Sequence, residues 1–272
     1  VLAALARFHL KHNDFQAYAA VLLRRADALA GQPEQAAALL EAGAVFRDQL
    51  GQAAEARACF EKAVALHPSN PEVLAALAAM LAGEGRIDEA TALYERQLSL
   101  CDSPSAKAAV LTNLARALCE KPDGLTEAER RLDEALDLDP NHLPAVVTMA
   151  DILYREEQWD RAERRLNEAL RRMRGQPEQT AKLYHRLGEV YEKLGRLDEG
   201  YRQLVEADKA LPGQLMLRIA LGENRFQARR WRDAATHLDG IADHQAAPKN
   251  PEVGGLALAG LEGAGHAAMV MP

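Results

Sequence analysis

Small and bulky side chains return along this chain in a fixed helical order. A small residue is followed four positions later by a large apolar residue, and three positions after that by a third residue that is usually small. Offsets of four and three place all three side chains on one face of an α-helix, where small residues let a neighbouring helix approach and the large one fills the gap. The six occurrences are Ala56/Phe60/Ala63, Ala90/Tyr94/Gln97, Ala128/Leu132/Ala135, Ala162/Leu166/Ala169, Gly200/Leu204/Ala207 and Ala234/Leu238/Ile241.

The spacing of these triads is regular. Their leading residues lie alternately 34 and 38 positions apart, and Pro68, Pro140 and Pro212 follow one another at intervals of 72. The segment Gly31–Gln35 recurs unchanged at Gly175–Gln179, which is 144 positions further on. Proline lacks an amide donor and clashes with the preceding turn, so it marks the ends of helices. An internal repeat of this kind predicts a repeating unit of two helical hairpins.

Each triad helix is preceded by another helix with its own pattern, which is clearest just before Gly200. Tyr184, Leu187, Gly188 and Tyr191 lie on that helix and are followed by a turn over residues 194–199. This order resembles the tetratricopeptide repeat consensus, although Gly200 stands where the family prefers Ala. The abundance of Ala, Leu and Arg suggests a bacterial member of the family. The same order begins again at Leu77-Ala78, Met149-Ala150 and Leu221-Gly222.

The resemblance covers roughly nine tenths of the chain and implies an all-α fold, a right-handed superhelical solenoid of antiparallel helix hairpins. We expect about seven hairpins in an array over residues 1–248, near 1–31, 33–68, 70–102, 104–140, 142–174, 177–212 and 214–246. Residues 249–272 are rich in Gly and Ala and are expected to form a partial eighth repeat or a capping helix. Its glycines each disfavour helix by up to about 1 kcal/mol, so we expect it to fray.

Composition narrows the possible partners and compartments. The formal net charge is -7 and aromatic residues make up only 5% of the chain. Such a chain has no basic excess to neutralise a phosphate backbone, which argues against nucleic acid as a partner. No apolar run approaches the roughly 20 residues of a membrane span, so direct membrane insertion is not expected. We expect a soluble protein, cytoplasmic rather than periplasmic; because the chain begins at Val1, which suggests a fragment, a periplasmic location stays open.

Cysteine usage and scattered polar pairs give no enzyme signature. Cys59, Cys101 and Cys119 form no C-x-x-C pair, which argues against a zinc site, although Cys101 and Cys119 could pair with each other. His9 with His12, and Glu156 with Glu157, lack a third ligand or a catalytic grouping.

A glycine-rich run and two tryptophans also give no evidence of a cofactor or ligand site. The run from Gly263 to Ala268 follows a helix, whereas a dinucleotide fingerprint requires a strand. Trp159 and Trp231 come just after a turn, at a habitual aromatic packing position. The sequence therefore predicts no enzyme, no metal and no cofactor.

A single hairpin cannot bury its apolar faces alone, so stacked hairpins must cover one another and leave a concave inner wall formed by the first helix of each unit. Such a wall suits a peptide or a partner protein. From helical phase we expect its partner-binding residues to be Asn113, Arg116, Thr148, Asp151, Tyr154, Arg155, Lys182, His185, Arg186, Glu189 and Glu192.

Some members of the family use such a wall as a carboxylate clamp for the acidic C-terminus of chaperones. Asn113 stands where a clamp asparagine would be, and Lys182 with Arg186 has the clamp spacing, but they lie two units apart. Ala75, Ala76 and Ala79 fill the inner face where further clamp residues would be expected. The sugar-transferase branch, with its ladder of inner asparagines, fits no better because only Asn113 is in place.

Three functional hypotheses follow from the resemblance. The first is an adaptor or scaffold that binds a peptide or partner protein in the groove. The second is a regulatory sensor domain that controls an attached effector. The third is a structural module of an envelope, secretion or motility assembly, in which the array could self-associate. Fold alone does not decide among them.

Overall fold

The computed structural model describes residues 1–32, 34–173 and 176–239. Fourteen α-helices and no strand occur in these ranges, which confirms the all-α fold class. The chain divides into two compact units, one of residues 1–139 and one that begins at Pro140. The expected partial repeat at 249–272 lies outside the described residues. Over the ranges described, no helix is both long and apolar enough to cross a bilayer.

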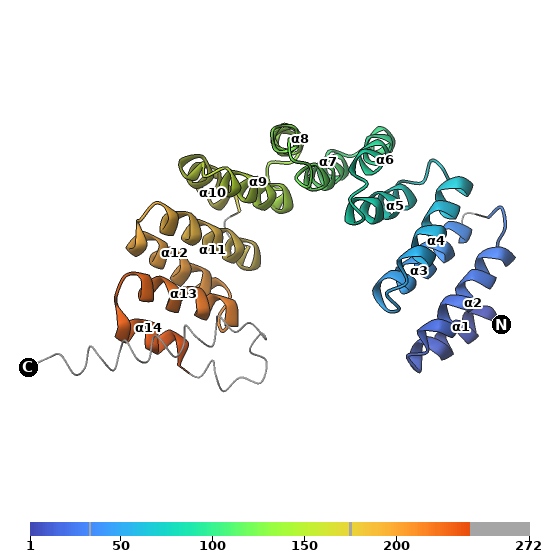
Figure 1. Ribbon diagram of the computed structural model, residues 1–272, viewed down its shortest axis with the longest axis horizontal. Helices are drawn as coiled ribbons and strands as arrows, with labels where there is room; N and C mark the ends of the chain where they lie inside the picture. The colour runs from blue at the N-terminus through green and yellow to red at the C-terminus, as the bar shows by residue number, and fades with distance from the viewer. Residues whose placement is uncertain (33, 174–175, 240–272) are drawn as a thin grey trace, which may run out of the picture. The chain divides into compact units, whose positions relative to one another are not determined.

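The first unit contains four helical hairpins (Figure 1). Every helix packs against the next one in the chain, and α3, α5 and α7 also contact one another in sequence. The first helices of these three successive hairpins therefore lie side by side and form one layer. The eight helices are α1 (Leu2–Lys11), α2 (Phe15–Ala28), α3 (Glu34–Asp48), α4 (Ala53–Leu66), α5 (Pro71–Gly83), α6 (Ile87–Leu100), α7 (Pro104–Leu118) and α8 (Leu125–Leu138).

The second unit contains three hairpins. Each helix again packs against the next, and α9 touches α11 across the layer of first helices. The six helices are α9 (Leu143–Arg155), α10 (Trp159–Arg172), α11 (Pro177–Lys193), α12 (Leu197–Ala210), α13 (Leu215–Gln227) and α14 (Trp231–Leu238).

Local sequence explains where several helices begin. Asn70 precedes α5, and its side-chain oxygen accepts from the backbone N–H of Glu72 at 2.9 Å, while Pro71 occupies the first helical position. Ser103 caps α7 in the same way, with Pro104 next to it. A capping side chain satisfies an amide that has no partner inside the helix, and proline has no amide to satisfy there.

The two helices of a hairpin meet where a bulky side chain of the second helix faces a small residue of the first. Phe60 on α4 is 1% exposed, and its ring fills the space beside Gly43 on α3. Leu204 lies in the same way against Gly188, and Leu238 against Gly222. The bulky residue of the sequence triads is thus the side chain that holds two antiparallel helices at close distance.

Gly43→Ala tests this packing. A Cβ at position 43 would lie 2.4 Å from Cε1 of Phe60, which is buried and cannot move aside. We expect the substitution to lower the free energy of unfolding by about 1–3 kcal/mol, the usual effect of overpacking. Denaturant unfolding of the whole chain, followed by helical circular dichroism, measures it.

The matched control is Gly83→Ala. Gly83 is exposed at the end of α5 and has nothing within 4 Å of a built Cβ. There the same substitution should raise helix stability by up to about 1 kcal/mol. Equal effects of the two substitutions would contradict the packing described.

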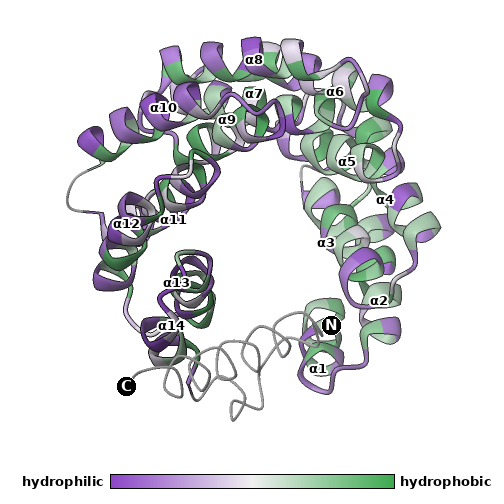
Figure 2. Cartoon of the chain, turned by 60° about the vertical axis from the view of Figure 1, so that its left-hand side comes forward, coloured by the Kyte–Doolittle hydropathy of each residue, from purple (hydrophilic) through white to green (hydrophobic). Residues whose placement is uncertain are grey.

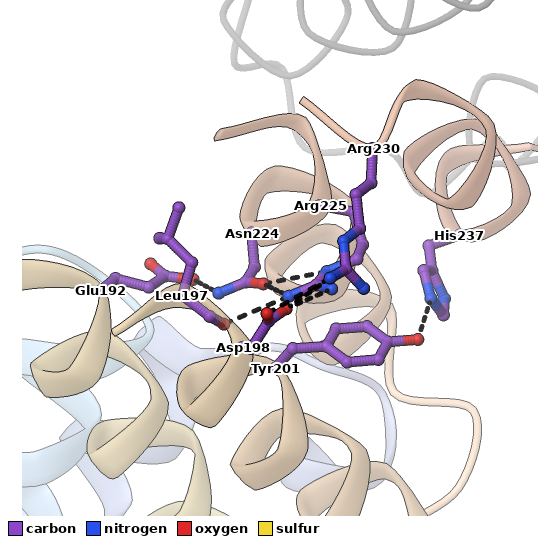
Figure 3. Close-up of polar contacts among 8 residues, drawn as sticks. All are labelled: Glu192, Leu197, Asp198, Tyr201, Asn224, Arg225, Arg230 and His237. Carbon is purple, nitrogen blue, oxygen red and sulfur yellow. Dashed lines mark hydrogen bonds and ion pairs between the residues drawn. The ribbon is translucent and has the colours of Figure 1, made fainter. Parts of the chain in front are cut away.

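A buried arginine joins the last two hairpins of the second unit (Figure 3). The Arg225 side chain on α13 is 1% exposed. Its Nη1 donates to Oδ1 of Asp198 at 3.1 Å, and its Nη2 donates to Oδ1 of Asn224 at 2.6 Å and to the Leu197 carbonyl at 3.2 Å. The guanidinium carbon lies 3.8 Å from the centre of the Tyr201 ring. Three acceptors and an aromatic face compensate for the loss of water around the charge.

Arg225→Met should therefore destabilise the chain although it preserves much of the side-chain volume. The buried acceptors of Asn224 and Leu197 lose their donor, which costs about 1–3 kcal/mol. Arg230→Met is the matched control, because Arg230 contacts the same Asp198 at 3.1 Å from an exposed position and should change stability by about 0–1 kcal/mol. If thermal unfolding of the whole chain shifts equally for both, the buried network is not what joins these hairpins.

Candidate functional site

A hollow of about 710 Å³ opens on the layer of first helices in the second unit. Three first helices, α9, α11 and α13, contribute to its wall, and Leu204 of α12 is the one lining residue from a second helix. The hollow thus lies where stacked hairpins leave side chains that no neighbouring helix covers. Its lining residues are Tyr154, His185, Glu189, Glu192, Lys193, Leu204, Met216, Ile219, Ala220, Glu223 and Gln227.

The structure brings several of the predicted groove residues together. Tyr154, His185, Glu189 and Glu192 all line the hollow. Arg186 holds the neighbouring part of the face, because its Nη2 lies 2.8 Å from Asp151 on α9. An ion pair between α9 and α11 therefore fixes one side of the wall.

Other predicted residues lie elsewhere. Asn113 and Arg116 are exposed on α7 in the first unit. Thr148 is buried beneath the face, and its hydroxyl donates to the Pro144 carbonyl at 2.8 Å. Arg155 and Lys182 are exposed on α9 and α11 but do not line the hollow.

Burial shifts the protonation of the groups in the hollow. The pKa of Glu192 is raised, chiefly by loss of solvent and further by the charges of Glu189 and Glu223, although a hydrogen bond from Asn224 and the charge of Lys193 oppose the shift. Burial also raises the pKa of Glu223, and the charge of Glu189 adds to that. Burial lowers the pKa of His185, which favours its neutral form. The carboxylates of this hollow are therefore ionised at a cost in free energy.

Glu192 is held from the adjoining hairpin. Asn224 Nδ2 on α13 donates to Glu192 Oε1 at 2.7 Å, while Arg225 fixes the same amide through its oxygen (Figure 3). Gly200 makes room for this amide, because a Cβ there would lie 3.2 Å from Asn224 Nδ2 and 3.0 Å from the Gly188 carbonyl. The departure from the consensus at Gly200 thus accompanies an asparagine that positions a carboxylate.

Residues of α13 were not among those predicted from helical phase, yet α13 contributes to the hollow. Adding the repeat spacing of 34 to residues 182, 185, 186, 189 and 193 of α11 gives Met216, Ile219, Ala220, Glu223 and Gln227, all of which line the hollow. The same phase rule, carried one hairpin further from the predicted residues of α11, would have found the first four of these but not Gln227, because Lys193 was not among the predicted residues. Asn224 is different, since it is fully buried and inner-face phase does not identify it.

A larger hollow of about 930 Å³ lies among α10, α11 and α12. Some of the charges that line it are paired within the chain, since Arg172 pairs with Glu168 at 2.6 Å and Glu163 pairs with Arg196 at 2.8 Å, whereas Arg164 and Arg171 each donate to a backbone carbonyl of α10. α10 is a strongly polar helix and is largely purple in Figure 2, whereas α5 is mostly pale to green. This hollow is larger than the one on α9, α11 and α13, but it lacks an exposed large apolar side chain such as Met216.

The histidines and cysteines considered in the sequence form no metal site or disulfide among the described residues. His9 lies 3.2 Å from Asp14, and the His12 ring lies 2.8 Å from the Phe8 carbonyl. Among residues 1–32, 34–173 and 176–239 no group of His, Cys, Asp or Glu is arranged to hold a metal ion. No disulfide joins Cys101 to Cys119. The run from Gly263 to Ala268 lies outside the described residues.

The two tryptophans occupy equivalent positions in two hairpins. Trp159 meets Tyr154 edge to face at 4.8 Å, and Trp231 meets Phe226 in the same way at 4.9 Å. Each ring packs across the turn of its own hairpin, as expected of a structural aromatic pair.

Comparison with known proteins places this chain among repeat proteins. The family model of the middle TPR-like domain of cilia and flagella-associated protein 70 matches residues 77–211, and a tetratricopeptide repeat model matches residues 49–100. A cellulose synthase operon protein C from Pseudomonas fluorescens (strain SBW25) is 34% identical over 161 residues. That alignment takes in 57% of this chain but only 12% of the relative.

Solved structures agree in fold at low sequence identity. A tetratricopeptide repeat protein from Parabacteroides merdae ATCC 43184 matches with a TM-score of 0.66 at 16% identity, over 96% of this chain and 97% of that one. A chain of the APC/C hetero-tetramer Cut9–Hcn1 matches with a TM-score of 0.60 at 17% identity, over 95% of this chain and 52% of that one. With its paired helices, its small-to-bulky packing and these matches, the chain belongs to the tetratricopeptide repeat family.

Proposed function

We propose that this chain is a protein-interaction module, an adaptor or scaffold, and that a peptide or partner protein binds on the exposed face of α9, α11 and α13. The observation that carries the proposal is the hollow on these three helices, with Met216 62% exposed at its wall. An exposed large apolar side chain beside a concave surface is typical of a place where another molecule docks.

The chemistry of the face suits protein recognition. Tyr154 offers a large amphipathic ring, and Met216 offers a flexible apolar contact that adapts to different partners. Polar groups line the same hollow, including Glu189, Lys193 and Gln227. Apolar anchors within a polar rim are the usual arrangement of a protein-binding surface. We assign this face no catalytic step.

One comparison favours a second candidate function. The relative that is 34% identical over 161 residues is named for a cellulose synthase operon. A repeat array could serve there as an assembly module that holds components of a polysaccharide-producing complex together. This hypothesis differs from the general adaptor only in the identity of the partner, so identification of the captured protein separates the two.

The double variant Tyr154→Ala/Met216→Ser tests the proposed face. It removes the aromatic and the aliphatic anchor without changing net charge, and because Tyr154 also packs on Trp159, thermal unfolding of the variant has to match that of the unchanged chain. We expect capture of protein partners from an extract of the source organism by the immobilised chain to fall at least about tenfold, as for loss of interface hot spots. The bound proteins are quantified by mass spectrometry.

The control is Phe8→Ala/Leu66→Ser in the first unit. Phe8 and Leu66 are 56% and 46% exposed, so this variant loses a comparable amount of exposed apolar surface. It should capture partners as the unchanged chain does. If both variants capture equally well, the partner binds somewhere other than this face.

A further inference from the structure

The charges of the hollow specify what kind of segment it accepts. Building on the proposed function, we propose that the hollow on α9, α11 and α13 binds a cationic segment of the partner, with an arginine or lysine side chain inserted between Glu192 and Glu223. Glu189 and Glu192 come from α11 and Glu223 from α13, and all three line the hollow.

Two of the three carboxylates form no ion pair with a cation among the residues that the structure describes. Glu189 is paired with Arg186 at 2.8 Å. Glu192 accepts from the neutral amide of Asn224. Within the described part of the chain, no side chain forms a hydrogen bond or an ion pair with Glu223. Glu192 and Glu223 therefore offer acceptor oxygens that a charged donor could bind.

The cations near the hollow do not fill this need. Lys193 lines the hollow and its charge acts on Glu192, but it forms no ion pair with Glu192, and its Nζ lies 5.6 Å from the centre of the Tyr154 ring. Arg186 is held by Asp151 and Glu189. His185 favours its neutral form because burial lowers its pKa. Carboxylates thus outnumber the cations that line the space three to one.

The apolar part of the lining completes the match to a long basic side chain. Met216, Ile219 and Ala220 from α13 and Leu204 from α12 lie beside the carboxylates. Arginine and lysine bury their aliphatic stems on apolar surface while their charged ends reach acceptors. The hollow offers both kinds of contact within about 710 Å³.

Electrostatics also decide against the opposite charge. Burial and mutual repulsion raise the pKa of Glu192 and of Glu223, so a cation that enters the hollow relieves an existing penalty. An acidic or phosphorylated segment would add a further negative charge and would be repelled. The ligand inferred here is therefore opposite in charge to that of a carboxylate clamp.

Fluorescence anisotropy with two labelled probe peptides tests the inference on the whole chain. One probe alternates arginine with leucine, and the other has glutamate in place of each arginine. We expect the arginine probe to bind and the glutamate probe to bind at least about tenfold more weakly. Similar affinity of the two probes would overturn the inference.

The variant Glu192→Gln/Glu223→Gln locates the effect, since it removes both charges and keeps the shapes of the side chains. It should bind the arginine probe at least about tenfold more weakly than the unchanged chain. The control Glu178→Gln/Glu206→Gln changes net charge equally at two exposed positions of the same unit and should keep full affinity. Equal losses in the two double variants would mean that general charge, and not the hollow, attracts the probe.

The affinity should also depend on pH in a definite direction. An ordinary glutamic acid has a pKa of about 4.3. Because the pKa values of Glu192 and Glu223 are raised, these two carboxylates begin to take up protons at a higher pH. Affinity for the arginine probe should fall as pH decreases from about 7 toward 5, because the two carboxylates lose the charge that attracts the probe. A cationic His185 would weaken binding further. The glutamine variant should show a smaller change, and an equal change would contradict the assignment.

The two proposals can fail separately. Protein capture can depend on Tyr154 and Met216 while the affinity for the arginine probe does not change in the Glu192→Gln/Glu223→Gln variant. In that case the face binds a partner that is not cationic, and only the inference of a cationic segment fails. If the probe depends on both carboxylates but capture does not depend on the apolar anchors, the proposed function of the face fails instead.

Discussion

Close contact between a small residue on one helix and a bulky residue on the next governs this structure. Leu204 against Gly188 and Leu238 against Gly222 leave no room for a single extra methyl group, so each hairpin has one way to close. Once hairpins close in this manner, their first helices must lie in one layer, as α3, α5 and α7 do in the first unit. The outward side of that layer is then free of packing contacts with other helices, and its side chains can bind another molecule.

In the second unit this freedom is combined with a rigid support. Arg225 is buried and satisfied by three acceptors, and it orients the Asn224 amide that donates to Glu192 (Figure 3). A carboxylate at the hollow is thereby held from the neighbouring hairpin. Gly200 belongs to the same arrangement, since the asparagine needs the space that a Cβ would take. Stability and binding thus share residues at this junction.

Much of the fold could be predicted from the sequence because packing requires the same residue types at every repeat. Phe60 and Leu204 belong to triads that are visible without any structure, and both are buried as their pattern predicts. The binding face has no such repeated requirement. Thr148 has the phase of an inner residue and is nevertheless buried, because the approach of neighbouring helices depends on side-chain size as well as on phase. Asn224 is recognisable only through its contacts across the junction.

Binding of a cationic segment requires that hairpin packing present Glu192 and Glu223 to a common hollow that the segment can enter. A crystal structure of the whole chain with the arginine–leucine peptide examines this most directly. We predict that an arginine of the peptide places its guanidinium within hydrogen-bonding distance of both carboxylates, with its aliphatic stem against Met216 and Ile219. A peptide seated on the second helices α10 and α12, or a Glu192 carboxylate turned away from Glu223, would contradict it.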